Sequence, residues 1–420
     1  MARLIINGGK KLTGVWRPSG NKNEVLPLLA ASLLFKKGLI LVNAPEIEDV
    51  KVMLAIARSL GVKIKGRKNL FSFTPSKKLG SVLPPEPSSK VRSSLLFLAP
   101  LLALHGRVSI PRSGGDKIGA RKIDTHLEAF LAFGAKISAN EIVLPAKIYR
   151  KQSPILVWLP ESSVTATENA LILAAARPAK TIIKNAACEP HVVGLGQALQ
   201  KAGAQISGLG TNLLKVIGTE NFKKVKHKIS EDYMEIGSAL VISAISDGQV
   251  KVRAGNGGEY QIIFDAFRKF GRKIIKDGQN YRAVTDKNHH ANHIQILSDD
   301  PWPSFPSDLM SVMVVLATQS PGQFLFHEKM FESRLHFTDQ LRALGAQLVL
   351  CDPHRVLIAG PSKLYGAHLV SPDIRAGMAL VIAALAAQGR SVIDNIEQLD
   401  RGYENLEEKL KVVGADVKRE

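Results

Sequence analysis

The sequence is poor in the features that mark several classes of protein. Its 420 residues include only two cysteines, Cys188 and Cys351, so a framework of several disulfides is excluded and a reduced, cytoplasmic protein is expected. The longest apolar runs, Val25–Phe35 and Leu95–Leu104, are shorter than the roughly 20 residues that a membrane span needs. The segment Met1–Gly9 has no basic stretch followed by a long apolar core, so no secretory signal is expected.

Aromatic residues are also scarce, at 6% of the chain, which argues against stacking platforms for nucleic-acid bases. Acidic residues are outnumbered by basic ones, 37 against 56, and the formal net charge is +19. Such an excess fits nucleic acid, an anionic membrane, small anionic substrates or merely a basic background. The basic residues are spread along the chain, so we expect neither a nucleic-acid nor a membrane partner, and the charge alone decides nothing.

Familiar catalytic motifs are missing as well. The chain has no G-x-x-x-x-G-K-[ST] phosphate loop and no G-x-S-x-G elbow. The histidines His289, His290 and His293 lie close together, but no further ligand set accompanies them. We therefore expect a polar loop there and no metal site.

What the sequence does contain is one short phrase repeated six times, a glycine followed by alternating apolar residues. Successive copies are 68 to 74 residues apart. The six copies are Leu60–Ile64, Phe133–Ile137, Ala202–Ile206, Phe270–Ile274, Leu344–Leu348 and Val413–Val417. Each predicts a helix that ends at a left-handed glycine and then a strand. Apolar helices that run into further strands complete each copy, for example Leu95–Leu104 before Arg107–Ile110. The sequence thus predicts an α/β protein of six small units, packed into two globular domains.

Charged residues interrupt this pattern just before the long apolar helices. Lys22, Arg92 and Arg375 lie at predicted helix N-termini, where a cation opposes the helix dipole. A cation becomes useful there when an anion binds to the free N–H groups. A solvated side chain is the plain alternative for each, and helix capping is the plain alternative for Asp308 and Asp373.

A second interruption follows a short strand in each repeat. In the second repeat it is the glycine-rich stretch Ser113–His126, which places Asp116 among three glycines. This composition suits a mobile lid that carries a reactive group, although a plain surface loop has the same composition. If similar ends of the repeats pack together, one cleft collects cations suited to a ligand with several negative charges. These cations are Lys22, Arg92, Arg121, Arg334, Arg375 and Arg401.

Over nearly its full length the chain resembles the UDP-N-acetylglucosamine enolpyruvyl transferases. The matching segments are Ser19–Asn23, Val91–Ser93, Gly114–Arg121 with Asp124, Phe305–Asp308, Phe331–Arg334, Asp373–Arg375 and Asp400–Glu404. The resemblance implies a two-domain inside-out α/β barrel built from six βαβαββ repeats. One domain spans residues 22–228 and carries the catalytic loop, and the other joins 1–21 to 229–420, with a hinge at the two crossings.

The resemblance also implies an activity without cofactor or metal. The enolpyruvyl group of phosphoenolpyruvate passes to the 3′-hydroxyl of UDP-N-acetylglucosamine with release of phosphate, in peptidoglycan precursor synthesis. The implied catalytic residues are Asp116, Lys22, Asp308 and Arg401. Those implied for phosphoenolpyruvate are Lys22, Asn23, Arg121, Arg375, Arg401 and Arg334. Those implied for the nucleotide sugar are Asn23, Arg92, Arg121, Asp124, Thr125, Ser163, Val164, Asp308 and Met330.

The chain departs from the family pattern at several positions. Many members carry cysteine where this chain has Asp116, so we expect insensitivity to the epoxide fosfomycin, which alkylates that cysteine. Thr165, Cys188, His191 and Tyr233 also differ from the usual residues and flank the nucleotide side. The alternatives are a 3-phosphoshikimate 1-carboxyvinyltransferase and a non-catalytic paralogue that binds nucleotide or nucleic acid. We expect a monomer or a weak homo-oligomer.

Overall fold

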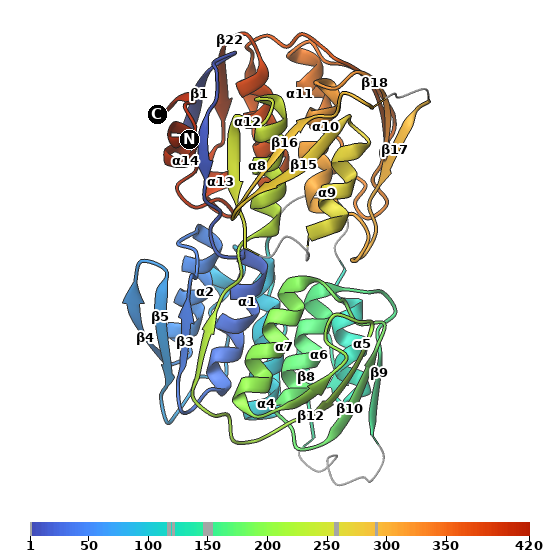
Figure 1. The fold of residues 1–420 in the computed structure, drawn as a ribbon. Coiled ribbons are helices and arrows are strands. Elements are labelled where there is room, and N and C mark those ends of the chain that lie inside the picture. The colour runs from blue at the N-terminus through green and yellow to red at the C-terminus, as the bar shows by residue number, and fades with distance from the viewer. Residues whose placement is uncertain (1, 116–118, 120–121, 146–153, 256–259, 290–292) are drawn as a thin grey trace. The chain divides into compact units, whose positions relative to one another are not determined.

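The computed structural model describes residues 2–115, 119, 122–145, 154–255, 260–289 and 293–420 (Figure 1). The chain divides into two compact units, each with its own hydrophobic core. The first, called here the 20–230 unit, contains Gly20–Gly115 and Arg121–Ser230. The second, the 231–420 unit, contains Met1–Ser19, Asp116–Ala120 and Glu231–Glu420. Between neighbouring residues that the structure describes, the chain therefore passes from one unit to the other at 19/20 and at 230/231.

The 20–230 unit holds three sheets. In sheet order, their strands are β13 (Val225–Lys228), β3 (Leu39–Val42), β5 (Leu70–Pro75) and β4 (Val62–Arg67); β11 (Gln205–Ser207), β12 (Leu213–Ile217), β10 (Lys180–Lys184) and β9 (Ile155–Trp158); and β6 (Arg107–Ser109), β8 (Glu141–Val143) and β7 (Lys136–Ile137). The helices are α1 (Lys22–Ala31), η1 (Ser32–Leu34), α2 (Glu48–Ser59), α3 (Pro85–Ser88), η2 (Arg92–Phe97), α4 (Leu98–His105), α5 (Asp124–Ala132), α6 (Val164–Ala175) and α7 (Pro190–Ala202).

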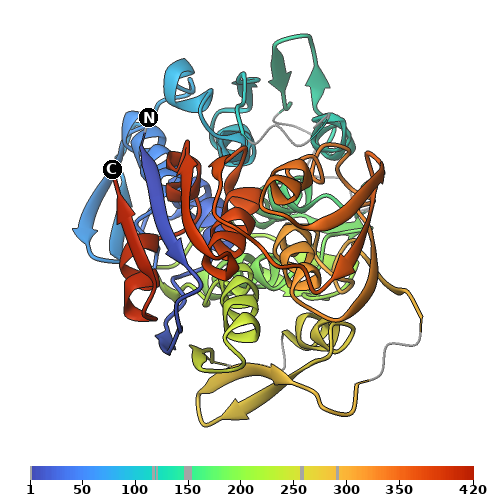
Figure 2. The same cartoon turned by 90° about the horizontal axis from the view of Figure 1, so that it is seen from above.

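The 231–420 unit also holds three sheets, which lie at its outside with helices between them (Figure 2). In sheet order, their strands are β15 (Arg272–Asp277), β16 (Asn280–Thr285), β14 (Val250–Arg253) and β2 (Gly14–Trp16); β17 (Gln295–Ser298), β18 (Gly322–His327), β20 (Arg355–Gly360) and β19 (Gln347–Asp352); and β21 (His368–Val370), β22 (Gly389–Asp394), β1 (Arg3–Gly8) and β23 (Asp416–Arg419). The helices are α8 (Tyr233–Ile245), α9 (Gln261–Arg268), η5 (Ser307–Leu309), α10 (Met310–Thr318), α11 (Thr338–Ala343), α12 (Ile374–Ala386), α13 (Glu397–Asp400) and α14 (Leu406–Val412).

The sheets repeat one topology, which confirms the prediction of six α/β repeats. Each four-stranded sheet has one parallel pair at its edge, such as β17 with β18, followed by two antiparallel pairings. The described strands of the sixth sheet, β6, β8 and β7, show the antiparallel part. Three strands pair with strands that are distant in the sequence. β13 pairs with β3, β2 pairs with β14, and β1 lies between β22 and β23. The N-terminal strands therefore complete sheets of the 231–420 unit.

The repeated glycines adopt the backbone conformation that the sequence predicts. All six have φ between 64° and 115°, in the left-handed region that disfavours other residues. They are Gly61, Gly134, Gly203, Gly271, Gly345 and Gly414. Each follows or caps a helix, so these glycines end one helix of every repeat and release the chain into the next strand.

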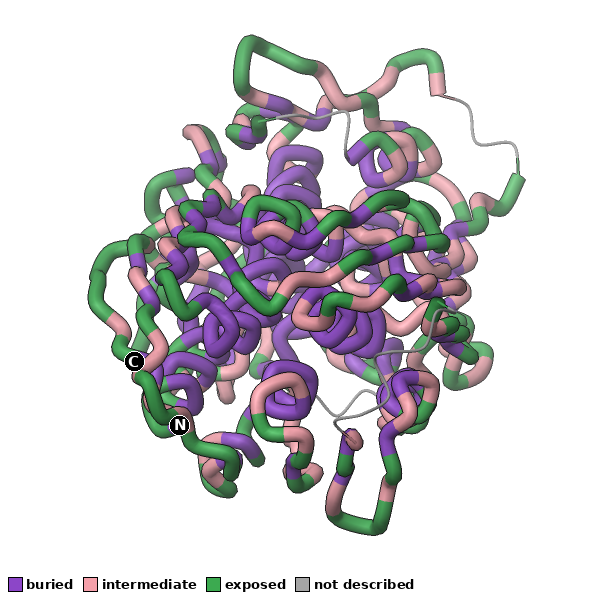
Figure 3. The backbone as a smooth tube through the Cα atoms, turned by 90° about the horizontal axis from the view of Figure 1, so that it is seen from below, coloured by how far each residue is buried: buried purple, intermediate pink, exposed green. Residues whose placement is uncertain are grey.

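The longest apolar segments form central helices that are buried on every side (Figure 3). In the 231–420 unit, all residues of α10 and nearly all of α8 and α12 are buried. A helix without a polar face must be surrounded by protein, which accounts for the absence of amphipathic periodicity in these runs. Within the described part of the chain, we find no helix that combines the length and apolar character of a membrane span.

Candidate functional site

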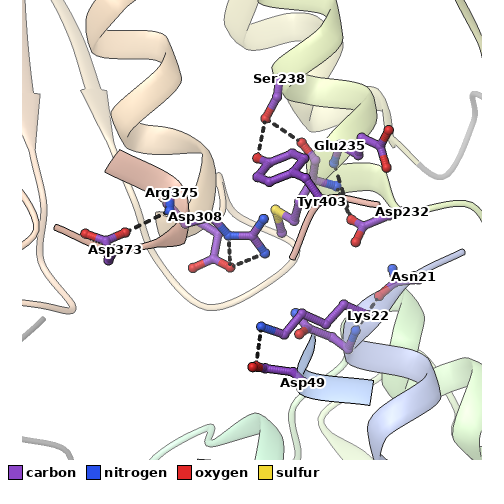
Figure 4. Close-up of polar contacts among 12 residues, drawn as sticks. Asn21, Lys22, Asp49, Asp232, Glu235, Ser238, Asp308, Asp373, Arg375 and Tyr403 are labelled. Atoms are coloured by element: carbon purple, nitrogen blue, oxygen red, sulfur yellow. Dashed lines mark hydrogen bonds and ion pairs between the residues drawn. The ribbon is translucent and has the colours of Figure 1, made fainter. Parts of the chain in front are cut away.

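Lys22 is the first residue of α1, at the end of the helix where backbone N–H groups are free. The helix is capped by Asn21, whose Oδ1 accepts hydrogen bonds from the amides of Asn23 (2.8 Å) and Glu24 (3.2 Å). The Lys22 ammonium lies 2.7 Å from Oδ2 of Asp49, in the first turn of α2 (Figure 4). Both side chains are nearly buried, with exposed fractions of 11% and 7%. Asp49 thus offsets the unfavourable dipole interaction and fixes the ammonium beside a helix N-terminus.

Asp308 of η5 lies between two arginines in the 231–420 unit. Its Oδ1 accepts from Nη2 of Arg334 at 3.0 Å. Its Oδ2 accepts from Nε and Nη2 of Arg375 at 2.9 and 2.8 Å (Figure 4). The side chains of Arg334 and Arg375 are 3% and 8% exposed, whereas the side chain of Asp308 is 31% exposed. The two buried arginines therefore hold the Asp308 side chain in place while part of it remains exposed to solvent, which suits a group that must act on a bound ligand.

Arg375 is held by more than Asp308. Asp373 caps α12 by accepting from the backbone amides of Arg375 (2.7 Å) and Ala376 (3.0 Å). Although burial lowers the pKa of Arg375, Asp308, Tyr403 and Asp232 together raise it above its usual range. The Tyr403 hydroxyl lies 3.1 Å from that of Ser238 on α8, and burial raises the Tyr403 pKa. Arg375 is thus a permanent cation whose backbone is held by the Asp373 cap and whose guanidinium group is held by Asp308.

The predicted nucleotide-side residues surround a polar network in the 20–230 unit. Arg92 begins η2 and donates to the backbone carbonyl of Lys122 at 2.7 Å. Thr125 donates to Glu161 at 2.8 Å. His126, the next residue of α5, is buried, and burial and then Arg92 lower its pKa to about 3. His126 is therefore neutral in the physiological range.

Thr165, a departure from the family pattern, belongs to this network. Asn169 accepts from the amide of Ala99 (3.3 Å) through Oδ1, so its Nδ2 is the donor to the carbonyl of Leu95 (3.0 Å) and to Nδ1 of His126 (2.9 Å). Nδ1 then accepts, and Nε2 carries the proton that faces Oγ1 of Thr165 at 3.0 Å. The threonine thus closes a hydrogen-bond chain between α5 and α6 that a glycine could not close.

Other predicted residues have simpler surroundings. Asp124 is exposed at the start of α5, Met330 is 43% exposed, and Arg401 donates to Gln398 at 3.0 Å. Ser163 is the N-cap of α6 and Val164 its first residue. The capping alternative is correct for Asp373, whereas Asp308 lies within η5 and its side chain binds arginines. Asp116 and Arg121 lie outside the described residues.

The described site residues fall into two sets, one in each unit. The 20–230 unit carries Lys22, Asn23, Arg92, Asp124, Thr125, Ser163 and Val164, and the 231–420 unit carries Asp308, Met330, Arg334, Arg375 and Arg401. Among the described residues, no group of three or more histidine, cysteine or acidic side chains could hold a metal ion. Each set contains cations that suit an anionic ligand, and three of them, Lys22, Arg92 and Arg375, lie at helix starts.

Three further departures have local explanations of different strength. Tyr233 is buried and packs against Tyr260 and Trp302, with ring centroids 6.1 and 5.6 Å away, so this position serves packing. Cys188 is half-buried, and burial followed by the charge of Glu189 raises its pKa, which disfavours a reactive thiolate. His191 is buried in the first turn of α7.

Sequence reasoning missed several residues that complete the site. Asp49 contacts Lys22, His126 contacts Thr165, and Asn169 contacts His126. Glu328 lies next to Arg334, and Asp299 is a neighbour of Glu328. Asp49 follows Glu48 at a helix start, where acidic residues are common for dipole reasons alone. Nothing in its sequence context distinguishes a partner of Lys22 from an ordinary first-turn carboxylate.

Comparisons with known proteins show the family to which the chain belongs. Over residues 6–410 the chain matches the family model described as EPSP synthase (3-phosphoshikimate 1-carboxyvinyltransferase). It is 44% identical over 423 residues to the UDP-N-acetylglucosamine 1-carboxyvinyltransferase of Treponema denticola, with 99% of each chain covered. It is 41% identical over 428 residues to the Bradyrhizobium diazoefficiens protein of the same name, covering 99% of this chain and 98% of that one.

A solved structure supports the fold. The enolpyruvyl transferase NikO from Streptomyces tendae superimposes with a TM-score of 0.86 at 21% identity, covering 100% of this chain and 98% of that chain. At this level of identity the likeness establishes a shared fold and leaves the acceptor to the closer relatives.

Proposed function

The chain belongs to the UDP-N-acetylglucosamine 1-carboxyvinyltransferases, within the wider enolpyruvyl transferase family, and from this premise we propose its reaction. It transfers the enolpyruvyl group of phosphoenolpyruvate to the 3′-hydroxyl of UDP-N-acetylglucosamine and releases phosphate, which commits the sugar to peptidoglycan precursor synthesis in the cytoplasm. Identity of 44% along the whole chain carries this proposal. The site supports it, because Lys22, Arg334 and Arg375 are cations suited to substrates with several negative charges.

The proposed reaction is an addition followed by an elimination. The sugar hydroxyl oxygen bonds to C2 of phosphoenolpyruvate while C3 takes up a proton. The adduct then loses a proton from C3, the bond from C2 to the phosphate oxygen breaks, and inorganic phosphate leaves. Asp308 accepts the hydroxyl proton, because it is the carboxylate that two arginines hold in place while it remains accessible. Asp116 is the proposed proton donor to C3.

Lys22, Arg121 and Arg401 are assigned to the phosphate and carboxylate of phosphoenolpyruvate, with Asn23, Arg334 and Arg375 in support. Arg92, Asp124, Thr125, Ser163, Val164 and Met330 are assigned to the nucleotide sugar. Arginine suits these roles because its planar fork pairs two oxygens at once. Fixed cations around the developing charge contribute to the rate because they need no reorganisation during reaction.

The decisive experiment measures phosphate release from phosphoenolpyruvate with alternative acceptors. We expect turnover with UDP-N-acetylglucosamine and a product heavier by one enolpyruvyl group. Turnover only with shikimate 3-phosphate would assign the chain to the other branch of the family. Release of no phosphate with either acceptor, together with binding of nucleotide or RNA, would identify a non-catalytic paralogue.

Insensitivity to fosfomycin is the expected consequence of Asp116. A carboxylate is a much weaker nucleophile toward an epoxide than a thiolate, so preincubation with the drug should leave at least about nine-tenths of the activity. Intact-mass and peptide analysis after exposure checks this result, and Asp116→Cys is the matched variant that should become sensitive. Time-dependent inactivation with label on Asp116 would contradict the prediction.

A further inference from the structure

Two buried carboxyl groups lie side by side behind Asp308. Asp299 directly follows β17 and Glu328 directly follows β18, and these strands are parallel neighbours whose last residues, Ser298 and His327, are paired. The topology therefore places both side chains at the same end of adjacent strands. Both residues are 0% exposed. Two ionised carboxylates in such a place would repel each other without water to screen them.

The hydrogen bonds of Asp299 indicate that the neighbouring carboxyl group carries a proton. Asp299 accepts from the amide of Lys329 through Oδ1 at 2.6 Å. Its Oδ2 is buried and meets no protein donor among the described residues. Glu328 follows the neighbouring strand at the same level, and a proton held by its carboxyl group would give the unsatisfied oxygen of Asp299 a donor. Burial, and then the neighbouring Asp299, raise the Glu328 pKa to about 9, so Glu328 is the carboxyl group expected to carry a proton.

Glu328 joins the elements that carry the predicted base. Ser307, the neighbour of Asp308 on η5, donates to both carboxyl oxygens of Glu328 at 2.8 and 2.9 Å. The amide of Phe331 donates to Oε1 at 3.2 Å. The carboxyl group thus fixes η5 and the segment that leads to Arg334.

Arg334 lies between Asp308 and Glu328. Its Nη2 hydrogen-bonds Asp308 at 3.0 Å, whereas its Nε is 3.6 Å from Oε2 of Glu328 and has no hydrogen-bond acceptor among the described residues. An ionised Glu328 would attract this guanidinium as strongly as Asp308 does. The contact of Arg334 with Glu328, at 3.6 Å, is longer than its bond to Asp308, at 3.0 Å, as expected if Glu328 is neutral.

We propose that Glu328 is a positioning residue that works in its protonated form, sharing a proton with Asp299 so that Arg334 stays bound to Asp308. This inference rests on the proposed function for the role of Asp308. Loss of the shared proton creates a second anion beside Arg334, draws the guanidinium away from Asp308 and lowers activity.

The other charged groups around Glu328 do not supply an alternative proton. From the turn after β18, Lys329 points to Asp300, with its ammonium 2.6 Å from that carboxylate. From the turn between β19 and β20, His354 donates through Nδ1 to the backbone carbonyl of Glu328 at 2.6 Å. The groups that face the side chain of Glu328 are therefore Asp299, Ser307 and Arg334, with Asp308 beyond the arginine.

The test compares the pH dependence of kcat/KM in two variants of the full chain. Glu328→Gln is a neutral isostere whose oxygen still accepts from Ser307 and whose amide donates to Asp299. It should retain activity within about threefold at pH 7, and it should lack the alkaline loss that the wild type shows as pH passes about 9. Asp299→Asn removes the like charge and lets Glu328 ionise more readily, so its activity should fall at lower pH than in the wild type.

Asp300→Asn is the matched control, because Asp300 is the next residue in the chain and pairs with Lys329 at the surface. Its pH profile should be that of the wild type. An alkaline limb that is identical in the wild type and in Glu328→Gln would overturn the proposal. So would loss of more than about a hundredfold of activity in a folded Glu328→Gln protein at pH 7.

A second measurement needs no substrate and separates this inference from the proposed function. The Glu328 pKa is raised in the folded chain, so the native state keeps a proton that the unfolded chain loses, and stability falls as pH rises from about 4.5 towards 9. Urea unfolding should show the unfolding constant of the wild type rising relative to Glu328→Gln, by up to about tenfold per pH unit. If the unfolding constant depends on pH in the same way in the wild type and in Glu328→Gln, the proposal of a shared proton is overturned. If the unfolding constants of the two proteins diverge with pH as expected but the chain transfers no enolpyruvyl group, only the proposed function is overturned.

Discussion

Replacing Asp308 with asparagine is expected to lower kcat by between about 10² and 10⁴, the usual contribution of a positioned general base. The substitution keeps the shape of the side chain and one oxygen for the arginines, but it removes the group proposed to accept the sugar hydroxyl proton. An amide N–H2 then faces one of the two guanidinium groups, so a loss of stability of about 1–3 kcal/mol should accompany the change. Steady-state phosphate release and urea unfolding measure the two effects separately.

The KM for phosphoenolpyruvate tests the role of Asp308 more specifically than kcat does. KM for phosphoenolpyruvate should change much less than kcat in Asp308→Asn, because the asparagine keeps one oxygen for Arg334 and Arg375 but no longer accepts the hydroxyl proton. Asp300→Asn makes the same chemical change eight positions earlier, at an exposed ion pair with Lys329, and should match the wild type in every measurement. Turnover by Asp308→Asn within tenfold of the wild type would remove Asp308 from proton transfer.

Replacing Lys22 with methionine is expected to have two distinct consequences. The loss of a fixed cation beside the α1 N-terminus should reduce kcat/KM for phosphoenolpyruvate by at least about 10²-fold. The Asp49 carboxylate, 7% exposed, then lies buried without its ammonium, which should cost about 3 kcal/mol of stability. Isothermal titration with phosphoenolpyruvate and urea unfolding report on binding and stability respectively.

A double variant separates these consequences. Adding Asp49→Asn to Lys22→Met removes the buried carboxylate that has lost its ammonium, so most of the lost stability should return while phosphoenolpyruvate binding stays weak. Asp49→Asn alone keeps the cation and should retain far more activity than Lys22→Met. Recovery of activity in the double variant would show that Lys22 acts only through its ion pair, contrary to the proposed role.

The sequence predicted the cations of the candidate site better than it predicted the roles of the carboxylates. Lys22 and Arg375 stand out because cations are unfavourable at helix N-termini, and the structure places both at helix starts with carboxylate partners. The carboxylates themselves were harder to assign. Asp308 resembles a cap in sequence, yet its side chain binds Arg334 and Arg375, which come from segments 26 and 67 residues away. Only folding brings such partners together.

The positioning groups were not predicted at all. Asp299 and Glu328 each follow a strand, and their sequence contexts give no sign that one faces the other. Parallel pairing of β17 and β18 brings the two strand ends level, and burial then forces a shared proton. His126 and Asn169 are similar, because the network that they form with Thr165 joins helices separated by 39 to 43 residues.

The sequence by itself determined the six repeats and the glycines that end their helices. A glycine that ends a helix acts through its own backbone, and an alternating strand or an apolar helix is a property of neighbouring residues, so six copies spaced by about 70 residues revealed six units. The tertiary structure decided which strands are exchanged: β13 joins the first repeat, β2 the fourth and β1 the sixth. Strand pairing depends on which edges meet in space, and no local pattern encodes that choice. The ionisation of the buried groups was decided in the same way, since desolvation and neighbouring charges exist only in the folded chain.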